Sequence, residues 1–385
     1  MTLLDHNING NTVAPNNLKE EEFQVTVWSE NCFSTAEADW TDLLYRSGVN
    51  PLFLSWAWMN GWWDIFRPSN GELRVIAVRI GGKLVGIAPL YCERSKMING
   101  LIPVVRIQLL GKRLEGSSGL RAEYMDFLVD PEYREAVLGT ICKTLIGWSD
   151  WTELSLQDMD TTSPNYGLIN KQILNAKCHH RIEGAGVSYE VKCNGYFPDY
   201  LAGLGSNTRL KLYNRRKLLE QQGEVALTKL NELNKSVAFD QLNSWHTERW
   251  GCEAFNSAIR QFIIKVLDEG DRFLSDFSSV LSVNGRPVSV IINVACRGRV
   301  YNIQLGYVNE YNKKISLGTL HIGYHIESAF SIQDISIFDF LEGEGKNSNY
   351  KKNLGHEGRR IESARWIRAF IPRLLYSTYD RYFRR

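Results

Sequence analysis

At 385 residues and 44% hydrophobic composition, the chain is too long for one ordinary core and suits two domains of about 150 to 200 residues each. The formal net charge of +2 excludes a whole-molecule attraction for nucleic acid, and seven cysteines without a C-x-x-C spacing exclude a disulfide framework or a zinc ribbon. No basic-then-apolar leader and no apolar run of about 18 residues occur, so we expect a cytoplasmic protein that is neither secreted nor membrane-spanning.

The first half of the chain predicts an ordered series of elements after a flexible tail. Residues 1–20 are rich in asparagine and poor in apolar residues, so they cannot bury enough surface to become ordered, and structure is expected to start near Phe23. Residues 73–90 predict two strands around a Gly81-Gly82 turn. A strand at 104–110, a helix at 138–148 and a strand at 153–157 follow.

The second half predicts the same series again. A hairpin at 280–293 with an Asn284-Gly285 turn precedes a strand at 300–307, a helix at 317–330 and a strand at 335–341. Residues 130–140 are also a degenerate copy of residues 307–320. The order predicts a mixed α/β fold of two duplicated domains, 21–195 and 226–385. A basic helical connector at 196–225 joins them and carries Arg209, Lys211, Arg215, Arg216 and Lys217.

The turn after the strand at 300–307 is the most informative feature of the sequence. A strand that leads through small residues into a helix N-terminus forms a cradle for an anion, because free backbone N–H groups and the positive helix end point at the ligand. Phosphate or pyrophosphate is the expected guest, although Ser316-Leu-Gly318 could also simply cap a helix. The predicted cofactor-binding residues are Lys313, Lys314, Ser316, Leu317, Gly318 and Thr319.

The C-terminal segment allows two interpretations. Residues 365–385 mix aromatic residues with arginines, a pattern that can lie on an anionic membrane surface. A docked terminal strand and helix is the alternative, since Pro372 interrupts any long amphipathic helix.

Two other clusters predict structure rather than chemistry. No metal site is expected, because adjacent histidines at 179 and 180 point to opposite faces of a strand, and Ile322 stands where a His-Glu-x-x-His motif needs glutamate. His321 and His325 share a helix face and are expected to pack or to line the cofactor helix. Four tryptophans could form a carbohydrate platform, but their spacing favours a packed helix: Trp56, Trp58, Trp62 and Trp63.

Several motifs follow one another along the chain: Phe53-Leu-Ser-Trp-Ala-Trp58, the glycine-turn hairpins, His246-Thr-Glu-Arg-Trp250, Ser316-Leu-Gly-Thr-Leu320, and Phe338-Asp-Phe-Leu-Glu-Gly343 followed by Tyr350-Lys351. In these motifs the chain resembles a family, the two-domain GNAT-type acyltransferases, in the CelD-like subgroup associated with cellulose and exopolysaccharide biosynthesis. The resemblance runs from about Phe53 to Gly355. It implies a tandem pair of GNAT folds, similar to the Fem-type peptidoglycan aminoacyltransferases, with acetyl-coenzyme A or another acyl-coenzyme A as donor.

The resemblance also distinguishes the two copies. The family's pyrophosphate loop reads Arg/Gln-x-x-Gly-x-Gly/Ala, and its best fit here is Lys313-x-x-Ser316-x-Gly318. In the first copy the fit is Arg134-x-x-Val137-x-Gly139, where a β-branched valine stands at the point of backbone approach to phosphate. The C-terminal copy is therefore expected to bind the donor, while the N-terminal copy is structural or binds the acceptor.

Acyl transfer needs a base for the acceptor and a proton for the leaving thiolate. Asp339 or Glu342, at the end of the strand that follows the cofactor helix, is the predicted base, with salt bridging or turn capping as the alternative. Tyr350 is predicted to protonate the thiolate. The predicted substrate-binding residues are Arg249, Trp250 and Lys351, the first two by hydrogen bonding and stacking on a sugar and the last by contact with a phosphate or an anionic acceptor.

The leading functional hypothesis is direct transfer of an acetyl or related acyl group to an amine or hydroxyl of a sugar or polysaccharide precursor. An aminoacyl-tRNA-dependent Fem-type transferase is one alternative, suggested by the basic connector. A catalytically silent accessory protein of a polysaccharide or cellulose synthesis complex is the other. The expected partners are thus a sugar acceptor, such a complex, and a membrane surface contacted through the arginine-rich C-terminus; nucleic acid is not expected outside the tRNA-dependent alternative.

Overall fold

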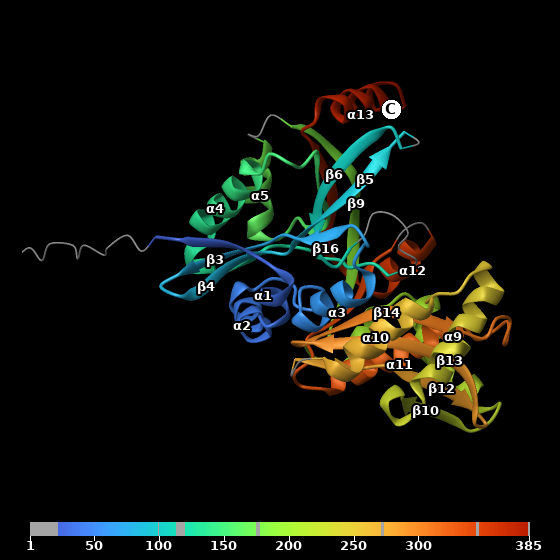
Figure 1. Ribbon diagram of the computed structural model, residues 1–385. Helices are drawn as coiled ribbons and strands as arrows, with labels where there is room; N and C mark the ends of the chain where they lie inside the picture. The colour runs from blue at the N-terminus through green and yellow to red at the C-terminus, as the bar shows by residue number, and fades with distance from the viewer. Residues whose placement is uncertain are drawn as a thin grey trace, which may run out of the picture.

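The computed structural model describes residues 22–98, 100–112, 120–174, 178–270, 273–343 and 346–383. The predicted flexible tail at residues 1–20 lies outside the described residues. In this part of the chain the fold is mixed α/β, as predicted, with one sheet of twelve strands and one of four (Figure 1).

The first half contains nine strands and five α-helices in the described residues. Its strands are β1 (Gln24–Trp28), β2 (Gly71–Leu73), β3 (Val75–Ile80), β4 (Lys83–Ala88), β5 (Leu90–Met97), β6 (Ile102–Leu109), β7 (Leu128–Val129), β8 (Glu153–Asp160) and β9 (His179–Lys192). Its helices are α1 (Glu30–Ser34), α2 (Glu37–Ser47), α3 (Trp56–Phe66), α4 (Arg134–Gly147), which follows a 3₁₀ turn at Pro131–Tyr133, and α5 (Pro164–Leu174).

The connector is helical in short pieces, and the second half follows it. The connector contains α6 (Phe197–Gly203), α7 (Ser206–Arg209), a π-helical turn (Leu210–Asn214) and α8 (Arg216–Glu220). The later strands are β10 (Val225–Lys229), β11 (Leu274–Asp276), β12 (Ser279–Val283), β13 (Arg286–Cys296), β14 (Arg299–Tyr307), β15 (Ile337–Glu342) and β16 (His356–Ile367). The later helices are α9 (Lys235–Trp250), which follows a 3₁₀ turn at Leu230–Glu232, α10 (Ser257–Glu269), α11 (Leu317–Ser331), α12 (Lys346–Leu354) and α13 (Phe370–Phe383).

Both predicted hairpins form at the predicted turns. Gly81 and Gly82 join β3 to β4 with φ of 55° and 83°, and Asn284 and Gly285 join β12 to β13 with φ of 50° and 71°. Two successive left-handed residues make the turn type whose twist matches that of the flanking strands, and glycine and asparagine tolerate it best.

The two halves exchange their last strands. The large sheet has the order β10-β12-β13-β14-β15-β9-β16-β8-β6-β5-β2, with β11 paired to β13. Strand β9 of the first half therefore lies between β15 and β16, and β16 of the second half lies between β9 and β8. The predicted boundary near residue 195 falls just after β9, so one continuous sheet crosses it; whether 21–195 and 226–385 fold as separate units stays a prediction.

Each half contains a parallel strand pair that separates after three residue pairs. Strands β14 and β15 pair only at 299–301 with 337–339, and β6 and β8 pair only at 106–108 with 153–155. The second strand of each pair then carries a non-glycine residue in the left-handed region, Leu341 with φ of 60° and Asp158 with φ of 50°. Register shifts accompany both residues. The shared irregularity supports the duplication and leaves a divergence between β14 and β15.

The core explains the tryptophan-rich helix. In α3 all four predicted core tryptophans are buried, and Trp58 packs edge-to-face on Phe53 and Phe262, with ring centroids 4.8 and 4.9 Å apart. Core packing, rather than a carbohydrate platform, is therefore their role. In the second half, α11 packs against β13, β14 and β15, while α9 packs against β13 and β14.

A buried polar network lies beneath α11. His321 Nε2 and His325 Nε2 lie 2.9 and 2.7 Å from Ser279 Oγ, while Ser289 and Asn293 contact the two Nδ1 atoms at 2.8 and 3.1 Å. Burial lowers the pKa of His325 to about 3 and the pKa of His321 well below its usual value. The two rings are neutral packing elements, one of the roles predicted for them.

This network predicts acid-sensitive stability. Because the folded-state pKa of each histidine lies below its unfolded value of about 6.5, its contribution is complete above that pH and is lost as the pH falls toward the folded pKa. The free energy of unfolding of His325→Gln should fall less steeply between pH 6 and pH 4, by about 1.4 kcal/mol per pH unit, than that of the parent. Urea denaturation at several pH values measures both slopes. His356→Gln, at an exposed site, should keep the parent slope; equal slopes for all three proteins would contradict the assignment.

The C-terminal segment forms a docked strand and helix, β16 and α13. Trp366 on β16 is buried, whereas α13 exposes several large apolar side chains: Phe370, Ile371, Leu374, Tyr379 and Tyr382. Contact of this segment with a membrane surface stays a prediction. Among the described residues, no helix has both the length and the apolar character needed to cross a membrane.

Candidate active site

The predicted anion cradle has the local geometry of an open helix end. Ser316 occupies the N-cap of α11 but makes no capping bond to the helix, and its hydroxyl lies 2.9 Å from the Thr319 hydroxyl instead. The first intrahelical bond comes from Leu320 N to Ser316 O, at 2.9 Å. The three preceding N–H groups therefore have no partner within the helix. Lys313 and Lys314 are exposed on the turn just before them.

Gly318 has a packing role that the sequence did not predict. A Cβ at this position would lie 2.6 Å from a ring carbon of Tyr307 and 3.0 Å from Leu305 Cδ2. The glycine thus lets α11 approach β14 closely. A bulky substitution there would displace Tyr307 as well as fill the cradle, so it is a poor probe of donor binding alone.

Tyr307, at the end of β14, is the point where several predicted residues meet. Arg249 Nη1 donates a hydrogen bond to the Tyr307 hydroxyl, and the Arg249 guanidinium carbon lies 5.0 Å from the centre of the Tyr307 ring. Tyr350 lies close enough for the two phenols to interact electrostatically. A bulge precedes this end of the strand, because the register of β13 with β14 skips Ile303. Bulges of this kind re-aim side chains and are frequent beside active sites.

Trp250 gives this region an exposed aromatic face. The side chain is 58% exposed at the end of α9, and the Arg249 guanidinium lies 5.2 Å from its ring centre. An exposed tryptophan next to an arginine can stack on a sugar ring while the arginine donates hydrogen bonds. That role for Arg249 and Trp250 stays a prediction.

Asp339 lies on the face of the sheet opposite α11. Phe338 and Phe340 pack in one core cluster with side chains of α11, so Asp339 between them points the other way, toward the first half. Its carboxylate accepts hydrogen bonds from Tyr124 Oη at 2.9 Å, Arg299 Nη1 at 2.7 Å and Leu341 N at 2.8 Å. Burial raises the pKa of Asp339, and Arg299 opposes that rise. The predicted base is thus completely buried and held by three donors.

Strand alternation would place Glu342 opposite Asp339, but the structure places both on one side. Asp339 pairs with Glu190 and Glu342 pairs with Ser188, so three residues along β15 correspond to two residues along β9. The left-handed Leu341 absorbs the extra residue. Glu342 pairs with Arg121, and its own N–H donates to Glu123 Oε2 at 2.8 Å.

The buried side chain of Lys351 binds the backbone at the end of β15. Its ammonium donates to three successive carbonyls, those of Phe340, Leu341 and Glu342, at 2.6, 3.3 and 2.7 Å. Three contacts use all three ammonium protons. Burial lowers the pKa of Lys351. In this structure the Lys351 side chain thus holds the end of β15 in position. Its predicted contact with a phosphate or an anionic acceptor stays a prediction.

A further carboxyl, which the sequence analysis missed, lies at the centre of these groups. Glu123 is 3% exposed, and burial raises its pKa to about 8, with Arg121 opposing the rise. We use the name central charge cluster for Arg121, Glu123, Asp158, Asp339, Glu342 and Lys351. The charge-rich run Arg121-Ala-Glu123-Tyr124 was the only sequence signal for it, and nothing local linked that run to β15.

Arg121 links the members of this cluster on β8 to those on β15. Its Nε and Nη2 donate to the two oxygens of Asp158 on β8 at 2.9 and 2.6 Å, while Nη1 donates to Glu342 on β15. The fork geometry of the guanidinium permits these contacts at once. The central charge cluster therefore spans both halves at the divergent end of β15.

The basic connector is only partly available to a partner. Arg216 pairs with Glu327 and lies 3.8 and 4.5 Å from the ring centres of Tyr324 and Tyr213. Arg209 donates to the Leu201 carbonyl, whereas Lys211 and Lys217 are exposed. Of the charges that suggested RNA binding, that of Arg216 is thus used to hold the connector against α11.

Comparison with protein families identifies a matching type of domain in the second half of the chain. Residues 206–352, which contain α11, β14 and β15, match the family described as "Acetyltransferase (GNAT) domain". This match supports the predicted acyltransferase of the GNAT type and its donor class, acyl-coenzyme A. No curated protein shows significant similarity to this chain.

Solved structures establish the fold of most of the chain. The crystal structure of FemX matches with a TM-score of 0.62 at 11% identity, covering 92% of this chain and 99% of that one. A tandem GNAT protein from the clavulanic acid biosynthesis pathway matches with a TM-score of 0.50 at 12% identity, covering 91% and 100%. The DUF2156 domain of a putative lysylphosphatidylglycerol synthetase from Agrobacterium fabrum also has a TM-score of 0.50, at 6% identity, covering 90% and 97%. The predicted tandem GNAT-like architecture is confirmed.

Proposed function

We propose that this protein transfers an acyl group from an acyl-coenzyme A to an amine or hydroxyl of a sugar or polysaccharide precursor. The observation that carries the proposal is the uncapped N-terminus of α11, which lies within the matched domain beside the divergence of β14 and β15. Acetyl-coenzyme A is the proposed donor, and the link to cellulose or exopolysaccharide production rests on the sequence resemblance.

The residues of the cradle fit a diphosphate. The free N–H groups of Leu317, Gly318 and Thr319 supply donors along the positive helix end, and the exposed ammonium groups of Lys313 and Lys314 supply charge. When bound, coenzyme A supplies the acyl thioester. These residues would bind its diphosphate and so hold the coenzyme at the N-terminus of α11.

A general base and a hydrogen-bond donor for the leaving sulfur are proposed near the end of β15. A base must take the proton of the acceptor as the new C–N or C–O bond forms and the C–S bond breaks. Glu123, whose pKa is raised to about 8 by burial, is better matched to that task than Asp339, which already holds three donors. Glu342 remains a second candidate. Burial raises the pKa of Tyr350 to about 12, so this phenol is suited to donate a hydrogen bond to the departing sulfur.

Donor binding provides the first test. Replacing both exposed lysines, as Lys313→Ala/Lys314→Ala, should raise the Kd for acetyl-coenzyme A about tenfold or more, because two charge-assisted contacts to phosphate are lost. Isothermal titration calorimetry with the full chain measures this Kd. Lys143→Ala, an equally exposed lysine on α4, is the matched control and should keep the parent Kd. A well-folded parent protein that does not bind acetyl-coenzyme A would contradict the proposal.

Acceptor binding provides a separate prediction. If Trp250 stacks on a sugar, Trp250→Ala should raise the KM for a sugar acceptor about tenfold while changing kcat by less than a factor of two, since stacking is worth about 1–3 kcal/mol. Steady-state kinetics with a panel of amino sugars and sugar nucleotides measures both constants. Trp250→Phe should restore much of the affinity. A fall in kcat at unchanged KM would instead place Trp250 outside the acceptor site.

A further inference from the structure

A large cavity lies away from the cradle, between the start of α4 and α5 and the strands shared by the halves. Its volume is about 660 Å³, within the range of small-molecule sites. Its walls come from residues 47–49, from the first residues of α4 and α5, and from β9, β14 and β16. The degenerate copy of the phosphate-binding sequence, which begins at Arg134, lies at one edge.

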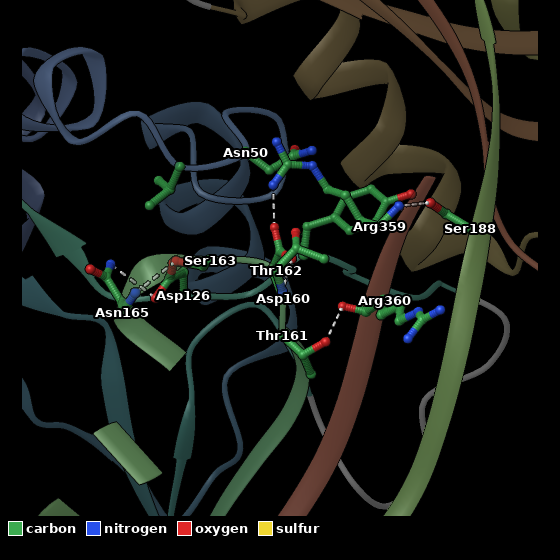
Figure 2. A network of polar contacts seen from close by, with 12 residues as sticks. Asn50, Asp126, Asp160, Thr161, Thr162, Ser163, Asn165, Ser188, Arg359 and Arg360 are labelled. Carbon is green, nitrogen blue, oxygen red and sulfur yellow. Dashed lines mark hydrogen bonds and ion pairs between the residues drawn. The ribbon is translucent and has the colours of Figure 1, made fainter. Parts of the chain in front are cut away.

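The start of α5 holds Arg134 in a fixed orientation. Asp126, which is 1% exposed, accepts hydrogen bonds from Ser163 Oγ and from Asn165 Nδ2, the latter at 3.2 Å. Asn165, itself 2% exposed, accepts from Arg134 Nε at 3.1 Å. Figure 2 shows Asp126, Ser163 and Asn165 gathered in this way. The relay uses only the Nε of the guanidinium and leaves its two terminal nitrogens available for a bidentate acceptor.

Some cations that line the cavity have an ion-pair partner and others do not. Arg359 pairs with Asp160, as Figure 2 shows, and Arg299 donates to Glu190 at 2.8 Å. By contrast, no carboxylate among the described residues lies within ion-pair distance of Arg134 or of Lys192, which is exposed on β9. Of the lining carboxylates, Glu190 is paired with Arg299 and Glu357 lies 3.9 Å from Arg360, so the unpaired charge of the cavity is the positive charge of Arg134 and Lys192. The N-terminal ends of α4 and α5 add their dipoles.

We infer that this cavity binds the phosphate or diphosphate group of a phosphorylated small molecule, with Arg134 and Lys192 as its charged contacts. The volume accommodates the rest of a ligand of nucleotide or pantetheine size beside its phosphates. This site is distinct from the cradle on α11 and gives a binding role to the N-terminal copy of the repeat. A sugar nucleotide and a coenzyme share the required chemistry.

A test in a background with a weakened cradle isolates the new site. The full chain carrying Lys313→Ala/Lys314→Ala is titrated with inorganic pyrophosphate by calorimetry, alone and with Arg134→Gln, Lys192→Gln or Lys171→Gln. Arg134→Gln and Lys192→Gln should each raise the Kd about tenfold or more. Lys171→Gln removes an exposed charge from α5 outside the cavity and should change the Kd by less than a factor of two.

Additional titrations show which kind of phosphorylated molecule binds, and thermal melts check that the variants are folded. Uridine diphosphate N-acetylglucosamine and coenzyme A are titrated in the same background; whichever loses affinity on Arg134→Gln is the kind of molecule the cavity takes. Thermal melts confirm that each variant folds, and the exposed position of Lys192 makes its variant informative even if Arg134→Gln is unstable. Absence of pyrophosphate binding at millimolar concentration, or an unchanged Kd in both cavity variants, would overturn the inference.

Discussion

Replacing Arg299 with methionine should lower the free energy of unfolding by about 3–5 kcal/mol at neutral pH. Arg299 is the cation that compensates Asp339, which is fully buried, and it also pairs with Glu190 at 2.8 Å. Methionine fills similar space but leaves the Asp339 carboxylate without its counter-ion, and an uncompensated buried charge is costly. Chemical denaturation at pH 7 measures the loss.

Two companion variants separate the lost charge from lost packing. Arg299→Met/Asp339→Asn also removes the charge of Asp339 and should recover a large part of the stability, because the fully buried carboxylate is gone and only the less buried Glu190 lacks its partner. Arg260→Met breaks the partly exposed pair with Asp240, at 2.8 Å, and should cost no more than about 1 kcal/mol. Equal losses in Arg299→Met and in Arg260→Met would show that Asp339 is neutral or rehydrated in the folded protein.

Replacing Glu123 with glutamine should lower kcat by about 10²- to 10⁴-fold, the contribution of a positioned general base. Because a base acts in its deprotonated form, the parent rate should rise with pH up to about 8, the raised pKa of this carboxyl, and level off above it. The variant should lose that rise. Glutamine retains an oxygen that can accept the Glu342 N–H, so the end of β15 keeps its contact.

Pre-steady-state acetyl transfer across pH 6–9 measures the profile of Glu123→Gln. Glu93→Gln is the matched control, since Glu93 is also buried and hydrogen-bonded but lies outside the central charge cluster. Its rate and pH dependence should match those of the parent. If Glu123→Gln keeps the parent profile, the base is another group, and Asp339→Asn and Glu342→Gln become the variants to compare.

Local sequence patterns predicted the two hairpins and the strand, helix and strand that follow each of them. Two adjacent glycines, or asparagine before glycine, allow successive left-handed residues, so both hairpins could be placed to the residue. The position of the cradle also follows from a local pattern of strand, small residues and helix. Such features depend on neighbours in the chain, which the sequence displays directly.

The rest of the candidate site depends on contacts between distant segments. Glu123 acquires its raised pKa because residues 120–127 lie against the end of β15, more than two hundred positions later. Strict alternation along β15 would place Asp339 and Glu342 on opposite faces, and it fails at Leu341, since a bulge moves side chains between faces without a sequence signal of its own. Likewise, nothing local indicated that Lys351 would hold three backbone carbonyls.

The exchanged strands bear on how the protein is made. During synthesis the ribosome releases β8 and β9 long before β16, which must insert between them, so both strands keep an open edge until residues 356–367 have emerged. Completion of the sheet is therefore a late, long-range event, which slows folding and exposes pairing edges to other chains. A nascent chain stalled before residue 356 should attract chaperones, because its large sheet lacks the strand that joins the two halves.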